Sequence, residues 1–300
     1  MKRSSLPDRI ELDGVVELLR CPDYKHGWSA VEISTAYSPD SWCLPSGLSH
    51  LREEWDRHHP NERSDPKVAL REIHVNEDHT LFCRLQATAW REVRPLHMGP
   101  KFDEDSLVRS KSDGYEMLLP NIGVVHVIAS TSDGWILAFR RSDLAHYHPG
   151  TWSATYEEGL APIDLGDAVF QRAALRGLTE EIAARALTVP LEAFRVVSVV
   201  LERPLGNPAV VVRANLPFPL AELSAERPSD ELDATSLISI PIDRTRLRDI
   251  LAAPTLALAS PAGIWHPTAR YRLLVAMAHF FGEDAAADAL SRVQRTEYRS

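Results

Sequence analysis

Lysine and cysteine are scarce in this sequence, and each scarcity excludes a class of function. Only five of the 33 basic residues are lysines, and the formal net charge is −9. Because sequence-independent binding of DNA or RNA depends on a broad basic surface, free nucleic acid is not an expected partner. The arginines that supply most of the positive charge suit local recognition of phosphate, although a bias in genomic composition produces the same excess.

The three cysteines, Cys21, Cys43 and Cys83, are odd in number and widely separated. Without a Cys-x-x-Cys pair they predict neither a disulfide framework nor a structural zinc site, and a reducing cytoplasm is the expected location. The first residues are not followed by an apolar signal core, and no apolar run approaches the length of a membrane span. We therefore expect neither export nor a membrane partner.

The sequence does contain enough apolar material for a folded chain, with 44% hydrophobic and 25% charged residues over 300 positions. A chain of this length can form two modest domains. The first hundred residues combine a helical pattern at Glu11–Leu19 with strand patterns at Val68–Val75 and Thr80–Ala89, which residues 76–79 join as a hairpin turn. The polar stretch Phe102–Tyr115 lacks periodicity and is expected to be a connector.

The middle of the chain alternates strand and helix patterns. Ile122–Ser130 and Trp135–Phe139 flank a Ser-Asp-Gly turn and predict a buried hairpin, whereas Ala168–Ala184 carries apolar residues at helical spacing. Further strands are expected at Phe194–Leu201, Ala209–Ala214 and Leu237–Ile242, and further helices at Arg244–Leu251 and His266–Phe281.

This order of elements predicts the α/β class and a mixed sheet in a domain over residues 118–253. We expect a small N-terminal α+β unit with its connector over residues 1–117, and a C-terminal helical extension over residues 254–300. The N-terminal unit is expected to pack on the central domain and to shape ligand access without supplying metal ligands.

Two adjacent acids, Glu180 and Glu181, lie on the predicted central helix one turn beyond Arg176. Neighbouring carboxylates repel one another unless they are solvated or neutralised, and a hydrated Mg²⁺ ion is one neutralising partner. The alternative is a solvated polar face with an Arg176–Glu180 pair, which is worth only a few tenths of a kcal/mol. Charge patterns of this kind are common, so the spacing alone favours the solvated face.

The surrounding motifs resemble the Nudix hydrolase superfamily. A strand pair ending in Arg140-Arg141 is followed by Pro149-Gly-Thr-Trp152, an acidic loop and the helix segment Ala173-Ala-Leu-Arg-Gly-Leu-Thr-Glu-Glu. The family signature is glycine, five residues, glutamate, seven residues, then Arg-Glu-aliphatic-x-Glu-Glu-x-Gly-aliphatic. The resemblance covers roughly residues 118–253 and implies a Nudix-like α/β/α sandwich around a mixed sheet.

The signature is degenerate at several positions. Gly177 stands where the glutamate after the arginine belongs, and Ala183 replaces the later glycine. Counting back from the arginine places Ala168, with Asp167 beside it, at the first glutamate, and Pro162 at the first glycine. A glycine, Gly159, occurs three residues before Pro162, which indicates a small insertion in the loop. One of the usual metal ligands is therefore missing from the predicted helix.

The resemblance implies Mg²⁺-dependent cleavage of a diphosphate, with Mn²⁺ as an alternative ion. In such enzymes the helix glutamates hold metal against the diphosphate while water attacks phosphorus. By resemblance Glu180 and Glu181 would bind metal, and Glu157, Glu158 or a downstream acid, of which Glu231 is the best candidate, would complete the metal site. The implied catalytic residues are Glu181, Arg176, which would hold the acidic loop or helix acids in register, and Glu231, for which a solvent-exposed loop is an equal alternative.

Four residues before the helix are candidates for binding the substrate. Arg140 and Arg141 could each clamp phosphate with paired hydrogen bonds, although strand alternation allows only one of them to point inward. His148 lies in the following loop and could contact a ligand, without any spacing that indicates zinc. Trp152 could line a pocket, but tryptophans more often fill cores.

The leading hypothesis is therefore a Mg²⁺-dependent hydrolase of a diphosphate linkage in a nucleotide derivative or another small organic diphosphate. The alternative is a Nudix-derived ligand-binding or regulatory protein that has lost efficient hydrolysis, and Gly177 is its strongest support. A biosynthetic enzyme with other chemistry on the same scaffold is a third, because fold does not fix chemistry. The expected partner is a small diphosphate or nucleotide, and a homodimer is compatible with the sequence.

Overall fold

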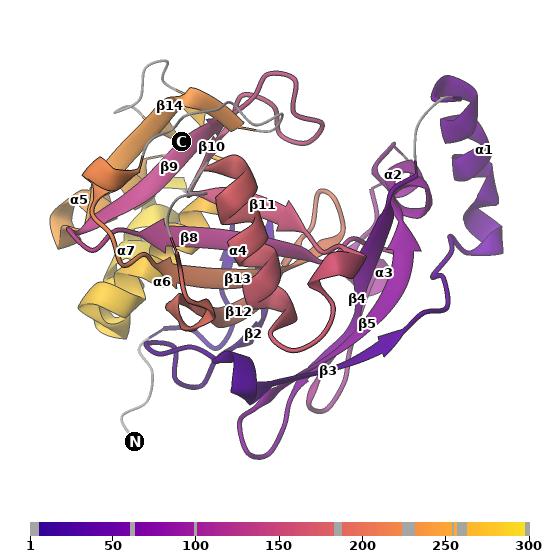
Figure 1. The fold of residues 1–300 in the computed structure, drawn as a ribbon, viewed down its shortest axis with the longest axis horizontal. Helices are drawn as coiled ribbons and strands as arrows, with labels where there is room; N and C mark the ends of the chain where they lie inside the picture. Colours follow the sequence, from indigo (N-terminus) through magenta and orange to yellow (C-terminus); the bar gives the residue numbers. More distant parts are fainter. Residues whose placement is uncertain are drawn as a thin grey trace.

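The computed structural model describes residues 6–60, 64–98, 101–182, 188–223, 232–253, 255–256 and 263–297. Within these ranges there is a large mixed sheet flanked by helices and a smaller sheet built from the N-terminal part of the chain (Figure 1). No helix in these ranges is long and apolar enough to cross a membrane.

The large sheet contains nine of the described strands: β1 (Glu11–Leu12), β2 (Val15–Arg20), β8 (Val124–Ser130), β9 (Trp135–Arg141), β10 (Trp152–Ser153), β11 (Tyr156–Gly159), β12 (Phe194–Glu202), β13 (Asn207–Asn215) and β14 (Leu232–Pro241). Their order is β1-β2-β12-β13-β8-β9-β10, with β11 paired to β8 and β14 to β9. Strands β13 and β8 are parallel and the other pairs are antiparallel, so the sheet is mixed, as predicted.

The N-terminal segment joins this sheet instead of forming the predicted helix over Glu11–Leu19. Val15, Val16 and Leu18 are buried, and β2 pairs antiparallel with β12. Because β-branched residues pack well on a pleated surface, pairing with β12 outweighs the weak helical spacing. The predicted boundary at residue 118 therefore divides a continuous sheet.

Helix α4 (Val169–Glu181) packs on one face of the large sheet, as its apolar spacing predicted. Phe170, Ala174 and Leu178 are at most 1% exposed and share a core cluster with Val127 and Val212 of the sheet. These contacts bury the apolar stripe of the helix and leave its polar positions on the outside.

Helices α5 (Arg244–Ala252), α6 (Ala269–Phe281) and α7 (Glu283–Glu297) cover the opposite face (Figure 1). Leu273 and Met277 of α6 share a second core cluster with Ile128 and Ile136 of the sheet. The predicted α/β class and α/β/α layering are therefore confirmed. However, the C-terminal segment is a layer of this domain, not an extension from it, and α7 was not predicted.

The smaller sheet has the order β3-β5-β4-β7-β6, formed by β3 (Ile33–Ser38), β4 (Pro66–Val75), β5 (Leu81–Ala89), β6 (Val108–Ser110) and β7 (Gly114–Met117). The β4–β5 hairpin confirms the prediction for that segment. The predicted connector Phe102–Tyr115 instead contains α3 (Glu104–Leu107), β6 and the start of β7, because Leu107 and Val108 are buried in the core shared with the large sheet. The remaining elements are α1 (Ser49–His58), α2 (Trp90–Met98) and the ribbon of β15 (Thr255–Leu256) with β16 (Gly263–Ile264).

Candidate functional site

Strand β11 presents consecutive residues to opposite faces of the large sheet. Tyr156 and Glu158 lie toward α4, where Glu158 pairs with Arg176. Glu157 lies toward α6, where it pairs with Arg272. Side chains alternate along a strand, which explains the separation. Glu157 and Glu158, which were predicted as alternatives for completing the metal site, therefore lie on different faces, and Glu157 does not join Glu180 and Glu181.

Gly177, the main departure from the family signature, lies where α4 packs against β11. A Cβ atom at this position would be 2.7 Å from Tyr156 Cε2 and 3.2 Å from Glu158 Cβ. The first distance is too short for a van der Waals contact, so any side chain here would force Tyr156 to move. Packing thus requires glycine at residue 177, and the Glu158 side chain begins in the space next to it.

Arg176 connects the helix, the acidic loop and β11. Its Nε and Nη2 atoms donate to Asp164 at 3.0 and 2.8 Å, and Nη2 also donates to the carbonyl oxygen of Gly159 at 2.9 Å. Its Nη1 atom lies 2.9 Å from Glu158 Oε1 and 3.3 Å from Glu180 Oε2. The structure thus brings Arg176 together with the acidic loop and with one helix acid, as the resemblance implied.

The acids on this face differ in their surroundings. Burial raises the pKa of Glu158 to about 7 against the opposing effect of Arg176, and the charge of Glu180 raises it further. The Glu180 side chain is 54% exposed. Glu181 lies close enough to Tyr156 for its charge to add to the effect of burial in raising the pKa of that phenol. In the described ranges these acids do not bring three ligand atoms within 4.8 Å of one another.

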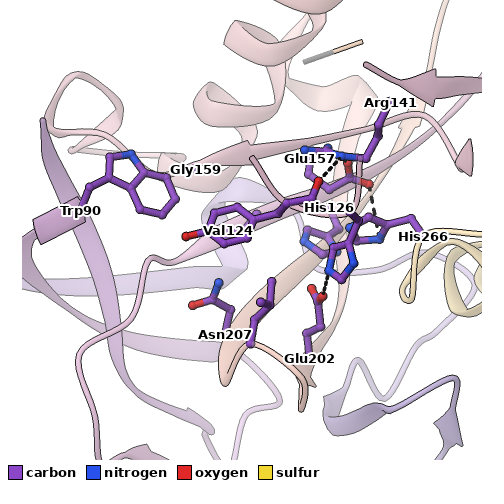
Figure 2. A pocket seen from close by; sticks show the side chains of 12 residues that line it. Trp90, Val124, His126, Arg141, Glu157, Gly159, Glu202, Asn207 and His266 are labelled. Atoms are coloured by element: carbon purple, nitrogen blue, oxygen red, sulfur yellow. Dashed lines mark hydrogen bonds and ion pairs between the residues drawn. The ribbon is translucent and has the colours of Figure 1, made fainter. Parts of the chain in front are cut away.

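A pocket that contains several titratable side chains opens on the other side of β11 and has a volume of about 80 Å³. Figure 2 shows the side chains that line it. Its titratable lining comes from β8, β9, β11, the end of β12, the loop after β9 and the segment before α6. The residues concerned are His126, Arg141, Tyr147, His148, Glu157, Glu202 and His266. So many titratable side chains around one small cavity make it a second candidate site.

Glu157 is the centre of an ion network in the pocket wall. Arg141 Nη1 lies 2.6 Å from its Oε2 atom, Arg272 pairs with Oε1, and the Ser153 hydroxyl donates to Oε1 at 2.5 Å. Burial alone would raise the pKa of Glu157, but the positive charges of Arg272 and Arg141 outweigh burial and hold the pKa well below its ordinary value. The carboxylate is therefore ionised and already neutralised by two guanidinium groups.

Next to this network, His148 and His266 approach Glu202. His148 Nε2 lies 2.5 Å from Glu202 Oε1, and the Glu202 side chain is only 3% exposed. One ligand atom from each of the three residues lies within 4.8 Å of the other two. No other group of three potential ligands in the described part of the chain meets this distance.

His126 and His266 share one hydroxyl group. Their Nδ1 atoms lie 2.8 and 3.0 Å from Thr268 Oγ1. Burial, followed by the nearby charge of Arg272, lowers the pKa of His126 to about 3. Burial also lowers the pKa of His266 well below its ordinary value, although the charge of Glu157 opposes this. Both rings are therefore neutral at neutral pH, when one nitrogen can donate and the other accept.

The N-terminal unit contributes to the outer part of this pocket. Trp90, the first residue of α2, lines the pocket on the side away from His266 (Figure 2). His97 of the same helix lies 2.7 Å from the Tyr147 hydroxyl, and Tyr147 also lines the pocket. The N-terminal unit thus packs against the central domain, as expected, beside a potential ligand site.

The predicted substrate-binding residues separate in the structure. Arg141 and His148 line the pocket, whereas Arg140 does not and pairs with the exposed Asp143. Only one of the two adjacent arginines therefore faces this pocket. Trp152 is fully buried in the core on the α6 side and does not line the pocket. Of its two predicted roles, the structure therefore supports core packing. Glu231 lies outside the described residues.

Sequence reasoning missed His126, Glu202 and His266, which line the pocket, and Arg272, which pairs with Glu157 in its wall. Each is a polar residue within or beside an apolar element, as in the run Val-Val-His126-Val-Ile. Buried polar groups have to be hydrogen-bonded or paired, so isolated polar residues in apolar runs are a signal of interior networks. That signal indicates burial but does not reveal which residues meet.

No protein-family model and no curated protein matches the sequence. Among solved structures, the Deinococcus radiodurans protein DR0079 is 13% identical, with a TM-score of 0.34, over 55% of this chain and 94% of its own. RenU, a Nudix hydrolase from M. smegmatis, is 18% identical, with a TM-score of 0.29, over 63% of this chain and 94% of its own. Similarities at this level leave the family open, so function is inferred from the site.

Proposed function

We propose that this protein is a Mg²⁺-dependent hydrolase that cleaves a diphosphate linkage in a nucleotide derivative or another small organic molecule. The position of Glu158 beside Gly177 carries the proposal. The Nudix signature has a glutamate at the position of residue 177, and the Glu158 side chain starts beside that position on β11 and pairs through its carboxylate with Arg176. Glu158 and Glu180 share the single guanidinium of Arg176, which leaves negative charge that a divalent cation would neutralise.

The donor set suits Mg²⁺, because hard cations prefer carboxylate oxygens. Glu158, Glu180 and Glu181 would hold the ion. Arg176 would keep the helix and the acidic loop in place through its hydrogen bonds to Asp164. When bound, Mg²⁺ supplies charge neutralisation at the diphosphate and acidifies a coordinated water.

The test is a turnover assay with Mg²⁺ or Mn²⁺ on nucleotide sugars, dinucleotides, ADP-ribose, nucleoside triphosphates and prenyl diphosphates. Glu181→Gln and Glu158→Gln are each expected to lower kcat by about two to three orders of magnitude on the substrate found, because glutamine keeps the shape but not the charge. Glu222→Gln is the matched control, since Glu222 is exposed in the same domain, and its turnover should equal that of the wild type. Unchanged turnover in both site variants at saturating Mg²⁺ would remove Glu158 and Glu181 from the mechanism.

A ligand-binding protein without hydrolytic activity is the second candidate. It is favoured by one observation: the acids on the α4 face do not converge on a common point, and Arg176 already pairs with Glu158 and Glu180. In that case no member of the panel yields product. Calorimetry would then detect binding of a panel member, such as ADP-ribose, that persists undiminished in EDTA.

A further inference from the structure

We propose that the pocket on the α6 side binds a transition-metal ion of the Zn²⁺ type through His148, Glu202 and His266. Their ligand atoms all lie within 4.8 Å of one another, and no other such trio is found in the ranges that the structure describes. Two imidazole nitrogens and one carboxylate form a donor set suited to Zn²⁺ and related first-row ions. The site lies across the sheet from the acids of α4 and does not depend on their role.

The three ligands come from different parts of the fold and converge on one end of the pocket. His148 follows β9, Glu202 ends β12 and His266 precedes α6. Figure 2 shows the Glu202 carboxylate directed at the imidazoles. The Glu202 and His266 side chains are 3% and 4% exposed, whereas that of His148 is 20% exposed, so the ion would enter beside His148.

The contact between His148 and Glu202 marks the position of the ion. His148 Nε2 and Glu202 Oε1 lie 2.5 Å apart and share a hydrogen bond. Tetrahedral ligands at the usual Zn²⁺ distances are roughly 3.4 Å apart, so an ion that replaces the shared proton would spread the pair by about 1 Å. His148 lies in a loop rather than in a strand or helix, so it is the residue that would move.

Thr268 and His126 provide the outer partners that metal-bound histidines usually have. In the ligating tautomer of His266, Nδ1 carries the proton and donates it to Thr268 Oγ1, at 3.0 Å. That hydroxyl then donates to His126 Nδ1 at 2.8 Å, and His266 Nε2 is left for the ion. This tautomer gives up the 3.2 Å contact from the Thr268 backbone N–H to His266 Nδ1.

The charge around the pocket indicates what an ion there would attract. Arg141 and Arg272 balance Glu157 and Glu202. A divalent ion would therefore make the pocket net positive. Three protein ligands also leave one position of a tetrahedral ion open. Water or an anionic group of a small molecule, such as a carboxylate or a phosphate, would occupy that position.

The test uses the full-length protein, stripped with EDTA, dialysed and kept free of Mg²⁺. Calorimetric titration should show one Zn²⁺ per chain, and Co²⁺ should give the strong visible absorption of a four-coordinate site instead of the weak bands of the hydrated ion. His148→Ala and Glu202→Gln should each weaken Zn²⁺ binding by more than the roughly 10–100-fold typical of losing an outer partner.

His26→Ala is the matched control. His26 Nδ1 also lies 2.8 Å from a carboxylate, that of Asp23, but it belongs to no trio of ligands. This variant should bind Zn²⁺ as the wild type does. Circular dichroism and thermal melts check the fold, and His148→Ala carries the test if Glu202→Gln does not fold.

Three results would overturn the proposal: no Zn²⁺ uptake by the wild type, a hydrated Co²⁺ spectrum, or wild-type affinity in His148→Ala. Glu181→Gln separates this site from the proposed hydrolytic one. It should lose turnover and retain Zn²⁺, whereas loss of Zn²⁺ in Glu181→Gln alone would assign the ion to α4.

Discussion

On the α6 side of β11, Glu157 lies between the guanidinium groups of Arg141 and Arg272, which hold its pKa well below the ordinary value. On the α4 side, Glu158 shares the single guanidinium of Arg176 with other acids, and burial raises its pKa to about 7. Two neighbouring residues of one type therefore carry different charges in the same fold. Glu157 is an ionised part of the interior that two guanidinium groups neutralise, whereas Glu158 has too little positive charge around it to offset its burial.

The largest effect should come from removing the fixed charge. Glu157→Gln leaves two buried guanidinium groups without their carboxylate, and breaking a buried ion network of this kind costs about 3–5 kcal/mol of unfolding free energy. Urea unfolding at pH 8 measures the loss. Glu158→Gln is the matched variant and should be neutral or stabilising at that pH, because it removes an unfavourable buried charge. Equal losses in both variants would contradict the contrast between the faces.

The pH dependence of stability should isolate Glu158. Its folded pKa of about 7 lies above the value of 4.5 expected in the unfolded chain, so the folded state binds the proton more tightly. The unfolding free energy of the wild type should therefore fall by about 2–3 kcal/mol relative to that of Glu158→Gln as the pH rises from about 4.5 to 7. Unfolding of both proteins in EDTA at pH 5 and pH 8 tests this. If the difference in unfolding free energy between the two proteins did not change with pH, the pKa of Glu158 would not be raised in the folded state.

The smallest effect concerns the packing that brings Glu158 to α4. Gly177→Ala gains up to about 1 kcal/mol of helix propensity, but its methyl group would lie 2.7 Å from Tyr156 Cε2 and cost about 1–3 kcal/mol. A net loss of about 1 kcal/mol is expected in urea unfolding. Gly47→Ala serves as the control, because a Cβ atom there meets nothing within 4 Å and should not destabilise. Stabilisation by Gly177→Ala would mean that β11 and α4 are not in tight contact.

The sequence predicted the parts of the fold that local patterns encode. The apolar stripe of α4 and the β4–β5 hairpin follow from spacing and turn residues, and both were confirmed. The prediction of a helix over Glu11–Leu19 was wrong for a physical reason. The segment forms strands because it pairs with β12, which lies far along the chain. Tertiary pairing overrides a short periodic pattern of this kind.

The residues of the two candidate sites also differ in whether local sequence patterns could reveal them. Arg176, Glu180 and Glu181 were found because they follow one another on a helix. Glu202 and His266 come from elements that only the sheet topology brings to His148, so no spacing along the chain could relate them. Strand alternation would have placed Glu157 and Glu158 on opposite faces of the sheet. It would not have shown which charged side chains each glutamate contacts.

The pocket receives His266 from the segment before α6, and Glu157 in its wall receives Arg272 from α6, which has a consequence for synthesis of the chain. Until α6 docks, Glu157 lacks Arg272, and Ile128 and Ile136 on the sheet lack their apolar cover. Domains are made from the N-terminus, and exposed apolar sheet surface in an incomplete chain favours aggregation or capture by chaperones. A nascent or truncated chain that ends before α6 would therefore remain a substrate for quality control, however well its earlier strands had formed.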